Sequence, residues 1–484
     1  MAYLGIDLGT SGLRALLVDD AGAAVASVTQ TYETHQPQHG WSEQDPATWT
    51  TALDAAMAEL RGLSAVYQDI RGIAVSGHMH GAVLLDAANR IIRPCILWND
   101  TRAEAEAAVL DGTPNVRALS GNIVFPGFTA PKLAWLRQNE PENFARVAKV
   151  LLPAGYLNWY LTGDHVADMS DSAGTAWLDV GQRDWSETLL AASGMRHEQM
   201  PRLTEGCHAA GLLDPNRARD WGLPPGIVVA GGAGDNAAAA CGIGALAEGQ
   251  GFVSLGTSGV LLLARGGYQP APATALHTFC HAVPDRWYQM GVMLSATDAL
   301  NWLSRISGQS PKALTAALGD DLRLPGPEVF LPYLAGERTP HNDANIRGAF
   351  TGLGTQTSLA DMTRAVLAGV AYGLRDSAEA IRAAGGRFDT LTAIGGGAAS
   401  RYWLRLIATV LDTDLRVPEG AEFGAALGAA RLAMIAHTGD AVETVMTPPK
   451  TREIIAPDPT VSAAFHADYA RFKATYPALK QITP

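Results

Sequence analysis

The stretch Asp7-Leu8-Gly9-Thr10-Ser11-Gly12 near the N-terminus recurs half a chain later as Ser254-Leu255-Gly256-Thr257-Ser258-Gly259. Each copy lies between two apolar runs, which predicts a strand, a tight turn and a second strand. Glycine lets backbone N–H groups converge on an anion in such a turn, and the Thr and Ser hydroxyls add donors. One copy would be weak evidence, because similar triplets are common in ordinary hairpins. Two copies in the same context predict two phosphate-binding turns with a nucleotide held between them.

The composition indicates a globular protein of two domains. Hydrophobic residues make up 47% of the 484-residue chain and charged residues 17%, an ordinary balance for a folded protein. One hydrophobic core rarely serves so long a chain, so two domains are expected. The twin turns agree, and we predict an N-terminal lobe of residues 1–244 and a C-terminal lobe of residues 245–484.

The net charge of −12 bears on the partners of the chain. A nucleic-acid partner would need a basic stripe, so we expect none, and a polyanionic ligand must be held by N–H groups or by Mg²⁺. The longest weakly polar run, residues 228–247, is mainly Gly and Ala and contains Asp235, so we expect no membrane span. The absence of a secretory leader and of paired cysteine spacing predicts a cytoplasmic protein with core cysteines. The sequence leaves the oligomeric state open, and a homodimer is only a guess.

Hydrophobic spacing and turn residues predict a similar order of elements in the two halves. The first half should have strands at 3–7, 13–18 and 23–32, a helix from 46 to about 62 with Asp45 as N-cap, and a strand at 72–75. The second half should have a hairpin at 252–263, a helix at 361–384, a strand at 391–394, a helix capped by Ser400 and ending at 410, a strand at 415–417 and a helix at 424–435. This pattern predicts an α/β fold with two similar lobes.

The stretch Gly231-Gly232-Ala233-Gly234-Asp235-Asn236-Ala237 follows a predicted strand and opens a helix of small residues. Its acid and amide can approach a ligand closely, because the glycines leave room. The same letters fit the fingerprint Gly-x-Gly-x-x-Ala of dinucleotide-binding folds, so a nicotinamide oxidoreductase is an alternative. That alternative expects an acid or Arg about twenty residues later, where the second turn stands, and it leaves the first turn unexplained.

Two histidine pairs and one mixed cluster are further candidates for chemistry. His78 and His80 can lie on one face of a strand, but no third ligand is near, so hydrogen bonding to a polar ligand or a core position is favoured over a metal. We interpret His277 and His281 in the same way, with a structural role preferred. The stretch Trp98-Asn99-Asp100-Thr101-Arg102 fits a polyol pocket and a surface turn with a salt bridge about equally well.

The sequence resembles the FGGY family of carbohydrate kinases over almost its whole length. The motifs that carry the resemblance are Asp7-Leu8-Gly9-Thr10, Gly234-Asp235-Asn236, the second turn, Gly395-Gly396-Gly397 and Ala426-Leu427-Gly428-Ala429-Ala430. Residues 127–139 resemble the family's first diagnostic stretch, and residues 348–367 its second, although Ala368 stands where an acid is usual. Gly77-His78-Met79-His80-Gly81, Leu97-Trp98-Asn99-Asp100 and Gly336-Glu337-Arg338-Thr339-Pro340-His341 are similar to members that phosphorylate xylulose. Glycerol-phosphorylating members carry Arg-Glu in place of Met79-His80, which disfavours glycerol.

The resemblance implies two actin-like, ribonuclease-H-like lobes that close over ATP and a sugar. It implies transfer of the ATP γ-phosphoryl group to the terminal hydroxyl of D-xylulose, with another ketose or a polyol as the alternative substrate. Asp235 would be the base, and the sugar would be held by Met79, His80, Trp98, Asn99, Asp235 and Asn236. Asp7 would act on Mg²⁺ directly or through water. ATP and its phosphates would be bound by Thr10, Ser11, Gly256, Thr257, Ser258, Gly396, Gly397 and Ser400.

A second class of function uses the same lobes. An actin-like ATPase could clamp a nucleotide between the two turns without passing phosphate to a small molecule. Such a protein has no need of Trp98-Asn99-Asp100 or of His80. Sugar-dependent release of ADP separates the two classes.

Overall fold

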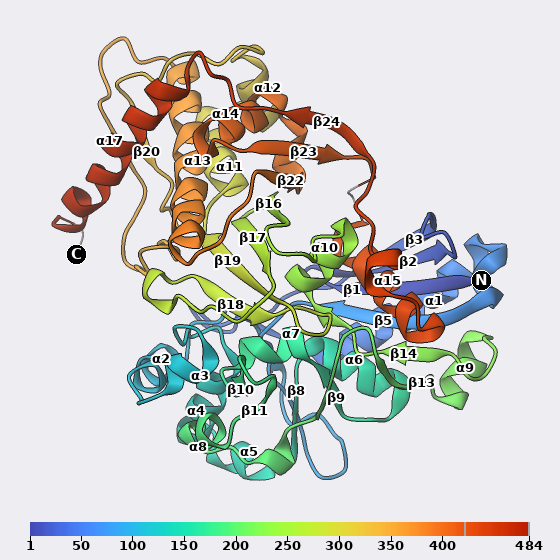
Figure 1. Ribbon diagram of the computed structural model, residues 1–484. Helices are drawn as coiled ribbons and strands as arrows, with labels where there is room; N and C mark the ends of the chain where they lie inside the picture. Colours follow the sequence, from blue (N-terminus) through green and yellow to red (C-terminus); the bar gives the residue numbers. More distant parts are fainter. Residues whose placement is uncertain (421–422, 483–484) are drawn as a thin grey trace.

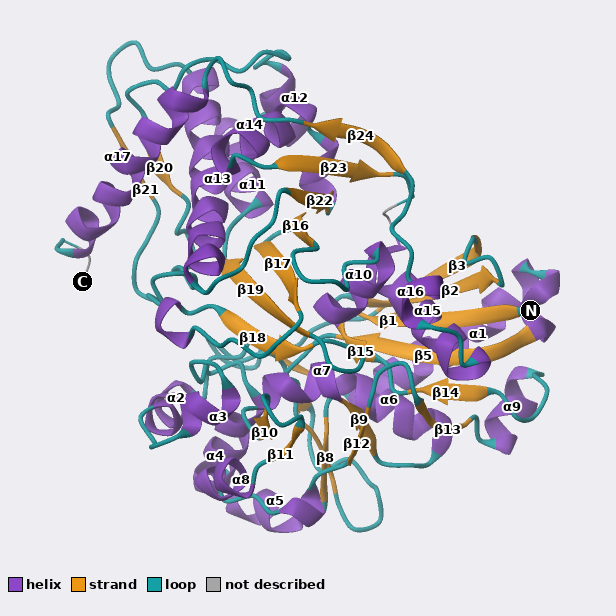
Figure 2. Cartoon of the chain, viewed as in Figure 1, coloured by secondary structure: helices purple, strands orange, loops and turns teal. Residues whose placement is uncertain are grey.

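The computed structural model describes residues 1–420 and 423–482, and its fold consists of two lobes, each built on a seven-stranded sheet. Figure 1 shows the strands of the first half at the right and those of the second half above, and Figure 2 shows the helices that cover them. The first sheet has the order β13-β14-β5-β1-β2-β3, with β15 also paired to β5. The second has the order β18-β19-β17-β16-β22-β23-β24. Both lobes therefore mix strands and helices as the sequence predicts.

The strands of the two sheets repeat one arrangement. In each, a hairpin carries one of the two repeated Gly-Thr-Ser turns, and its first strand pairs in parallel with a later strand, β1 with β5 and β16 with β22. The first sheet contains β1 (Ala2–Leu8), β2 (Gly12–Asp19), β3 (Ala24–Thr31), β5 (Ile70–Gly77), β13 (Ala209–Leu212), β14 (Val228–Ala230) and β15 (Ala233–Gly234). The second contains β16 (Gly251–Leu255), β17 (Gly259–Arg265), β18 (His277–Cys280), β19 (Trp287–Met293), β22 (Thr390–Ile394), β23 (Asp414–Pro418) and β24 (Thr451–Ile455).

The first sheet is buried on both faces. Leu4, Ile6 and Leu8 alternate along β1 and share a core with α1 (Pro46–Leu63) and α6 (Pro153–Thr162), as the period of two along a strand requires. Tyr3 points to the other face, where it packs against α15 (Gly424–Thr438). α15 also packs against α10 (Asp235–Ile243), and Figure 1 shows it, in orange-red, beside the blue strands. A helix of the second half thus covers the sheet of the first.

The two faces of the second sheet pack against different hydrophobic cores. Val253 and Leu261 share a core with α13 (Leu359–Ala383) and α14 (Arg401–Leu411), whereas Phe252 and Leu262 join a core that continues into the N-terminal half. The other α-helices and strands of the second half are α11 (Thr297–Ser307), α12 (Pro311–Ala316), β20 (Val329–Leu331), β21 (Ala349–Thr351), α16 (Val442–Val445) and α17 (Ser462–Lys480), of which α16 packs beside α15. The shared core fixes how the two lobes dock.

Residues 82–226 contain elements that the sequence analysis did not place. Short strands and helices form the lower part of the molecule in Figure 2. The helices are α2 (Glu104–Asp111), α3 (Val116–Ser120), α4 (Thr129–Asn139), α5 (Pro141–Arg146), α7 (Met169–Ser172), α8 (Glu187–Ser193) and α9 (Pro215–Trp221). The strands are β6 (Val83–Leu85), β7 (Cys95–Ile96), β8 (Lys149–Leu151), β9 (Val166–Asp168), β10 (Leu178–Asp179), β11 (Asp184–Trp185) and β12 (Arg202–Thr204), and β4 (Glu43–Gln44) pairs with β7.

The predicted starts of α1 and α14 are confirmed, and both helices have the capping residue that the sequence indicated. Asp45 accepts the N–H of Ala47 ahead of Pro46 at the first position of α1, and the Ser400 hydroxyl accepts the N–H of Trp403 at the start of α14. The four cysteines are buried and unbridged, as expected. The division at residue 244 stays a prediction, and α15 lies beyond it in sequence yet packs on the first sheet.

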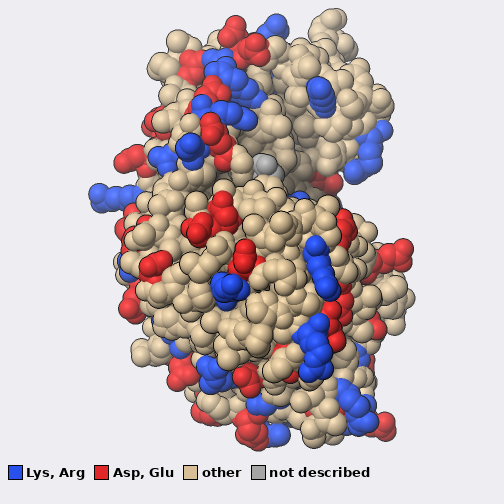
Figure 3. Space-filling view, turned by 90° about the vertical axis from the view of Figure 1, so that its right-hand side faces the viewer, with Lys and Arg blue, Asp and Glu red and all other residues tan. Residues whose placement is uncertain are grey.

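Surface charge and hydropathy add two observations. On the face drawn in Figure 3, Lys and Arg side chains lie among Asp and Glu rather than in one basic stripe. Within the described part of the chain, no helix combines the length and the apolar character that a bilayer crossing requires.

Candidate active site

A cavity of about 300 Å³ lies between the two lobes. We call it the interlobe cavity. Both halves of the chain line it, with Met79, His80, Trp98, Phe125, Gly127, Phe128, Asp235 and Asn236 from the first half and Ser258, Val260, His277, Met290, Val292, Leu294 and Arg338 from the second. Five of the predicted sugar-binding residues, and Ser258 of the second turn, therefore meet around one space.

Asp235 reaches this cavity because three parallel strands end together. β1 and β15 both pair in parallel with β5, so the carboxyl ends of all three lie at the same edge of the sheet. Asp235 follows β15 directly as the first residue of α10, where the helix dipole favours a negative charge. Burial raises its pKa to about 6, and the charge of Asp7 adds to the shift. The Asn236 N–H and side-chain amide both donate to Asp235 Oδ1, at 2.7 and 2.8 Å, which leaves Oδ2 to accept a proton.

Asp7 lies opposite Ser76 at the same sheet edge. The Ser76 hydroxyl donates to Asp7 Oδ1 at 3.2 Å, and burial raises the pKa of the Asp7 carboxyl. The first turn that follows is held on both sides, because Tyr32 donates to the Gly9 carbonyl at 2.6 Å and Trp98 Nε1 donates to Thr10 Oγ1 at 3.0 Å. Trp98 therefore joins the wall of the interlobe cavity to the first phosphate turn.

The second turn and the triple glycine lie together in the C-terminal lobe. Thr297 N–H and hydroxyl both donate to the Gly256 carbonyl, at 2.9 and 2.8 Å. Gly395 has φ of 86°, and a Cβ there would lie 2.8 Å from the Leu255 carbonyl carbon, so only glycine fits. Gly396 instead faces open space. Thr257 and Gly396 are exposed, Gly397 is buried, and the Ser400 hydroxyl caps α14 while keeping its own proton to donate.

His80 lines the interlobe cavity with a neutral ring whose Nε2 can accept a hydrogen bond. Its Nδ1 lies 2.7 Å from the Gly174 carbonyl, which can only accept, so Nδ1 carries the proton and Nε2 the lone pair. Burial lowers its pKa to about 3. The residue has φ of 71°, and the buried Lys132 holds this backbone by donating to the carbonyls of His80 and Gly127, both at 2.7 Å. Met79 packs beside it, against Gly234.

Metal binding is limited by the number of carboxylates. No group of three or more His, Cys, Asp or Glu that could hold a metal occurs among residues 1–420 and 423–482. Asp7 and Asp235 are two half-buried acids whose charges disfavour each other, and a divalent cation bound with phosphate oxygens and water would offset that repulsion. The donor set fits Mg²⁺ brought by a nucleotide, with Asp7 as the residue that would hold it directly or through water, and not a metal caged by protein alone.

The other sequence candidates have structural positions. His78 is buried against Trp49, with ring centroids 5.5 Å apart, and does not share a site with His80. Asn99 is exposed and lies outside the residues that line the interlobe cavity, so its contact with a sugar stays a prediction. Asp100 forms a buried ion pair with Arg102 and accepts the Ser42 N–H at 2.6 Å. The cluster at 98–102 thus combines a cavity wall at Trp98 with a salt bridge that is buried and not on the surface, and a polyol ligand at this wall stays a prediction.

Sequence reasoning missed several residues that line the interlobe cavity. His277 is buried and lies 3.3 Å from Asn122 Oδ1, which agrees with the preferred structural role, but it also lines the cavity, which the sequence did not indicate, while His281 is buried against the Ala245 carbonyl as expected. Phe125, Phe128 and Arg338 had no predicted role. The sequence indicated a role for this region only through the family-like stretches that contain Arg338 and Gly127. No local pattern shows that residues 125 and 338 meet.

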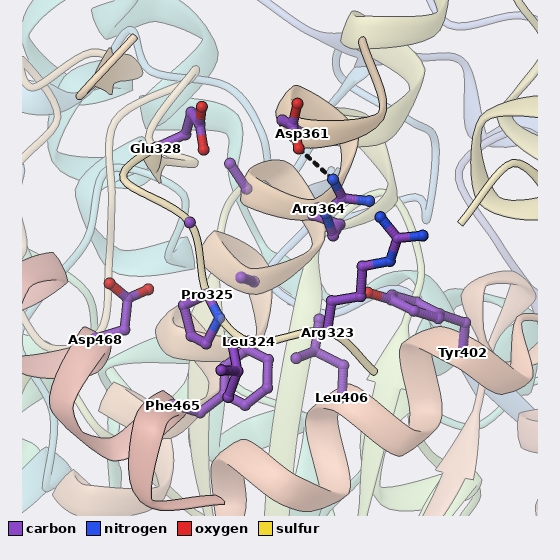
Figure 4. Close-up of a pocket in the computed structure, with 13 residues that line it drawn as sticks. Arg323, Leu324, Pro325, Glu328, Asp361, Arg364, Tyr402, Leu406, Phe465 and Asp468 are labelled. Atoms are coloured by element: carbon purple, nitrogen blue, oxygen red, sulfur yellow. Dashed lines mark hydrogen bonds and ion pairs between the residues drawn. The ribbon is translucent and has the colours of Figure 1, made fainter. Parts of the chain in front are cut away.

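A second cavity, of about 100 Å³, lies within the C-terminal lobe (Figure 4). It is surrounded by α13, α14, α17 and the segment 323–328, away from the strand ends that carry the twin turns. Arg364 pairs with Asp361, which caps the start of α13, and Asp468 accepts the Tyr372 hydroxyl at 2.8 Å. Its acids therefore already have partners within the protein.

Known proteins share this architecture. A crystal structure of a xyloylose kinase from Brucella ovis superposes with a TM-score of 0.98 at 53% identity and covers all of both chains. The xylulose kinase of Escherichia coli K12 is 47% identical over 436 residues, 90% of each chain. That of Lactococcus lactis is 35% identical over 497 residues, covering all of this chain and 98% of its own. The model of the N-terminal domain of the FGGY family of carbohydrate kinases matches residues 2–242, and that of the C-terminal domain residues 251–437.

The fold and the interlobe cavity define a two-lobed sugar kinase of the actin-like ATPase fold. The chain belongs to the FGGY family of carbohydrate kinases. This membership removes the nicotinamide oxidoreductase alternative and confirms the family suggested by the twin turns.

Proposed function

We propose that the protein phosphorylates D-xylulose, passing the γ-phosphoryl group of ATP to the terminal hydroxyl of the sugar. The observation that carries the proposal is Asp235, which presents a free carboxylate oxygen to the interlobe cavity beside Met79 and His80. The curated relatives named xylulose kinase, 35% and 47% identical, support the choice of sugar.

The roles of the residues follow from their chemistry. Asp235 Oδ2 accepts the proton of the attacking hydroxyl, and a pKa of about 6 keeps it ionised near neutral pH yet basic enough to help. His80 Nε2 accepts a sugar hydroxyl, and Asn236 and Trp98 complete the wall. Phosphoryl transfer depends mainly on positioning and on neutralising charge, which the two turns and a cation at Asp7 would provide.

The nucleotide is proposed to lie between the turns. Thr10 and Ser11 from one lobe and Gly256, Thr257 and Ser258 from the other would contact its phosphates, with Gly396, Gly397 and Ser400 beside the adenosine. Asp7 would hold Mg²⁺ directly or through water, and the ion would supply charge neutralisation when bound. A cytoplasmic location and a homodimer stay predictions from the sequence.

The test is ADP release from ATP and Mg²⁺ with D-xylulose, other pentuloses, hexuloses, glycerol or no sugar. We expect the highest kcat/KM with D-xylulose and little ADP without sugar. Equal ADP release with and without sugar would instead support the nucleotide-clamp ATPase, and a better second ketose would correct only the substrate.

A further inference from the structure

Arg338 is a cation in the interlobe cavity whose backbone N–H donates to Glu337, the neighbouring acid. It comes from the loop after β20 in the C-terminal lobe, and among the described residues it forms no ion pair. Its guanidinium carbon lies 4.5 Å from the centre of the Phe125 ring, and its Nη1 lies 3.5 Å from His277 Nε2. Burial lowers its pKa only to about 10, so the side chain stays charged at neutral pH.

A chain of hydrogen bonds fixes the partner of Arg338. Asn122 Nδ2 donates to the carbonyls of Ser120 and Thr278, at 2.7 and 2.9 Å, so its Oδ1 must face His277 Nδ1, 3.3 Å away. His277 Nδ1 then carries the proton, and Nε2 offers its lone pair to Arg338. Burial and the charge of Arg338 lower the pKa of His277 well below its usual value, which keeps the ring neutral. His277 therefore accepts from Arg338 and holds the guanidinium in place.

Three other side-chain donors along the cavity are already engaged. Trp98 Nε1 donates to Thr10, His80 Nδ1 to the Gly174 carbonyl, and the Ser258 hydroxyl to the Leu294 carbonyl at 3.3 Å. The walls near Arg338 are otherwise apolar, with side chains of Phe125, Phe128, Met290 and Val292. Arg338 is thus left with N–H groups that no residue of the described chain accepts.

We propose that Arg338 donates to the carbonyl oxygen of a ketose and, with His277 as its positioning residue, selects ketoses over the corresponding polyols. This inference rests on the proposed phosphorylation of a ketose. A ketone oxygen only accepts, which matches a donor-only guanidinium. A polyol places a hydroxyl there whose proton also needs an acceptor, and His277 Nε2 is already occupied by Arg338. The polyol would leave a buried polar group unpaired, which is costly in a site shielded from water.

The experiment compares the binding of D-xylulose and xylitol, which differ only at the carbonyl, by calorimetry. We expect Arg338→Met to weaken D-xylulose binding roughly 10- to 100-fold and to change xylitol binding little, because a charge-assisted hydrogen bond is lost only for the ketose. His277→Phe should reduce the same ratio to a smaller extent, and Arg338→Lys should retain part of it. The control is Arg347→Met, an exposed arginine of the same segment that donates to the carbonyls of Ala344 and Ile346.

The outcomes separate this inference from the proposed function. Equal losses for the two sugars, or an unchanged ratio in Arg338→Met, would overturn the role of Arg338. If Arg338→Met fails to fold, Arg338→Lys and His277→Phe decide, and an unchanged ratio in both overturns it. A wild-type protein that binds D-xylulose no better than xylitol would also overturn it, whereas wild-type protein without D-xylulose-dependent ADP release would refute the proposed function itself.

Discussion

The two phosphate turns differ in sequence only at the first position of the motif, Asp7 in one lobe and Ser254 in the other. The first turn follows a half-buried carboxylate at the edge where Asp235 also lies, and it is joined to the interlobe cavity through Trp98. The second turn follows Ser254, which carries a hydroxyl in place of the carboxylate, and packs against the triple glycine. The comparison teaches that one hairpin, used twice, has different surroundings in the two lobes: two acids lie beside it in the N-terminal lobe, and glycines lie beside it in the C-terminal lobe.

The largest expected effect is at Asp235, the proposed base. Asp235→Asn should lower kcat about 10²- to 10⁴-fold, the usual contribution of a general base, while the fold survives because the change is isosteric. Steady-state kinetics and a thermal melt measure both. Asp20→Asn, on the exposed turn after β2, is the matched control and should leave kcat unchanged. Near wild-type turnover by Asp235→Asn would show that Asp235 is not the base.

Asp7 and Ser254 test the asymmetry directly. Asp7→Asn should raise the Mg²⁺ concentration for half-maximal rate about 10- to 100-fold, as loss of a residue that holds a metal or its water does. Ser254 occupies the position in the second turn that Asp7 occupies in the first. Ser254→Ala should leave the Mg²⁺ dependence unchanged. A Mg²⁺ titration at saturating ATP and sugar is the measurement, and similar shifts in both variants would show that the turns share the metal equally.

His80 tests the sugar side of the N-terminal lobe. His80→Ala removes the Nε2 acceptor and should lower kcat/KM for the sugar about 10-fold, or roughly 1.4 kcal/mol. The KM for ATP should stay the same, because none of the hydrogen bonds that hold the two turns involves His80. An equal rise in the two KM values would assign His80 to the packing of the lobes.

Gly396 tests the nucleotide side of the C-terminal lobe. Gly396 faces open space, so Gly396→Val should leave the Tm unchanged and raise the KM for ATP about 5-fold, roughly 1 kcal/mol, by crowding the adenosine. The neighbouring change Gly395→Ala is the control for stability, since its positive φ and contact with Leu255 should cost about 1–3 kcal/mol. An unchanged KM for ATP in Gly396→Val would move the adenosine elsewhere.

The smallest effect concerns pH. The pKa of Asp235 is raised to about 6, so the base is protonated below that value and kcat should fall as the pH drops, to about half of its plateau at pH 6. The acidic limb should be absent from the residual activity of Asp235→Asn. A pH profile from 5 to 8 at saturating substrates checks it, and a limb that persists in the variant belongs to another group.

The comparison also shows what sequence could and could not provide. The two hairpins and the helices α1 and α14 could be predicted because turns and caps are local signals. Asp45 and Ser400 are the N-caps of the two helices. The short elements of residues 82–226 were not, because each is too short for a clear period. The pairing of Phe125 with Arg338 depends on how two lobes dock, and no local pattern encodes it.

Helix α15 has a consequence for the synthesis of the chain. Gly5 and Gly428 let it approach so closely that a Cβ on either would lie within 2 Å of a facing carbonyl oxygen, and Arg431 donates to the carbonyls of Cys241 and Gly242 at the end of α10. The first sheet is made early, yet the helix that covers one of its faces leaves the ribosome roughly 200 residues later, about 10–40 s at ordinary elongation rates. During that interval one face of β1 lacks its cover, so the nascent N-terminal lobe should be a client for chaperones that bind apolar strands.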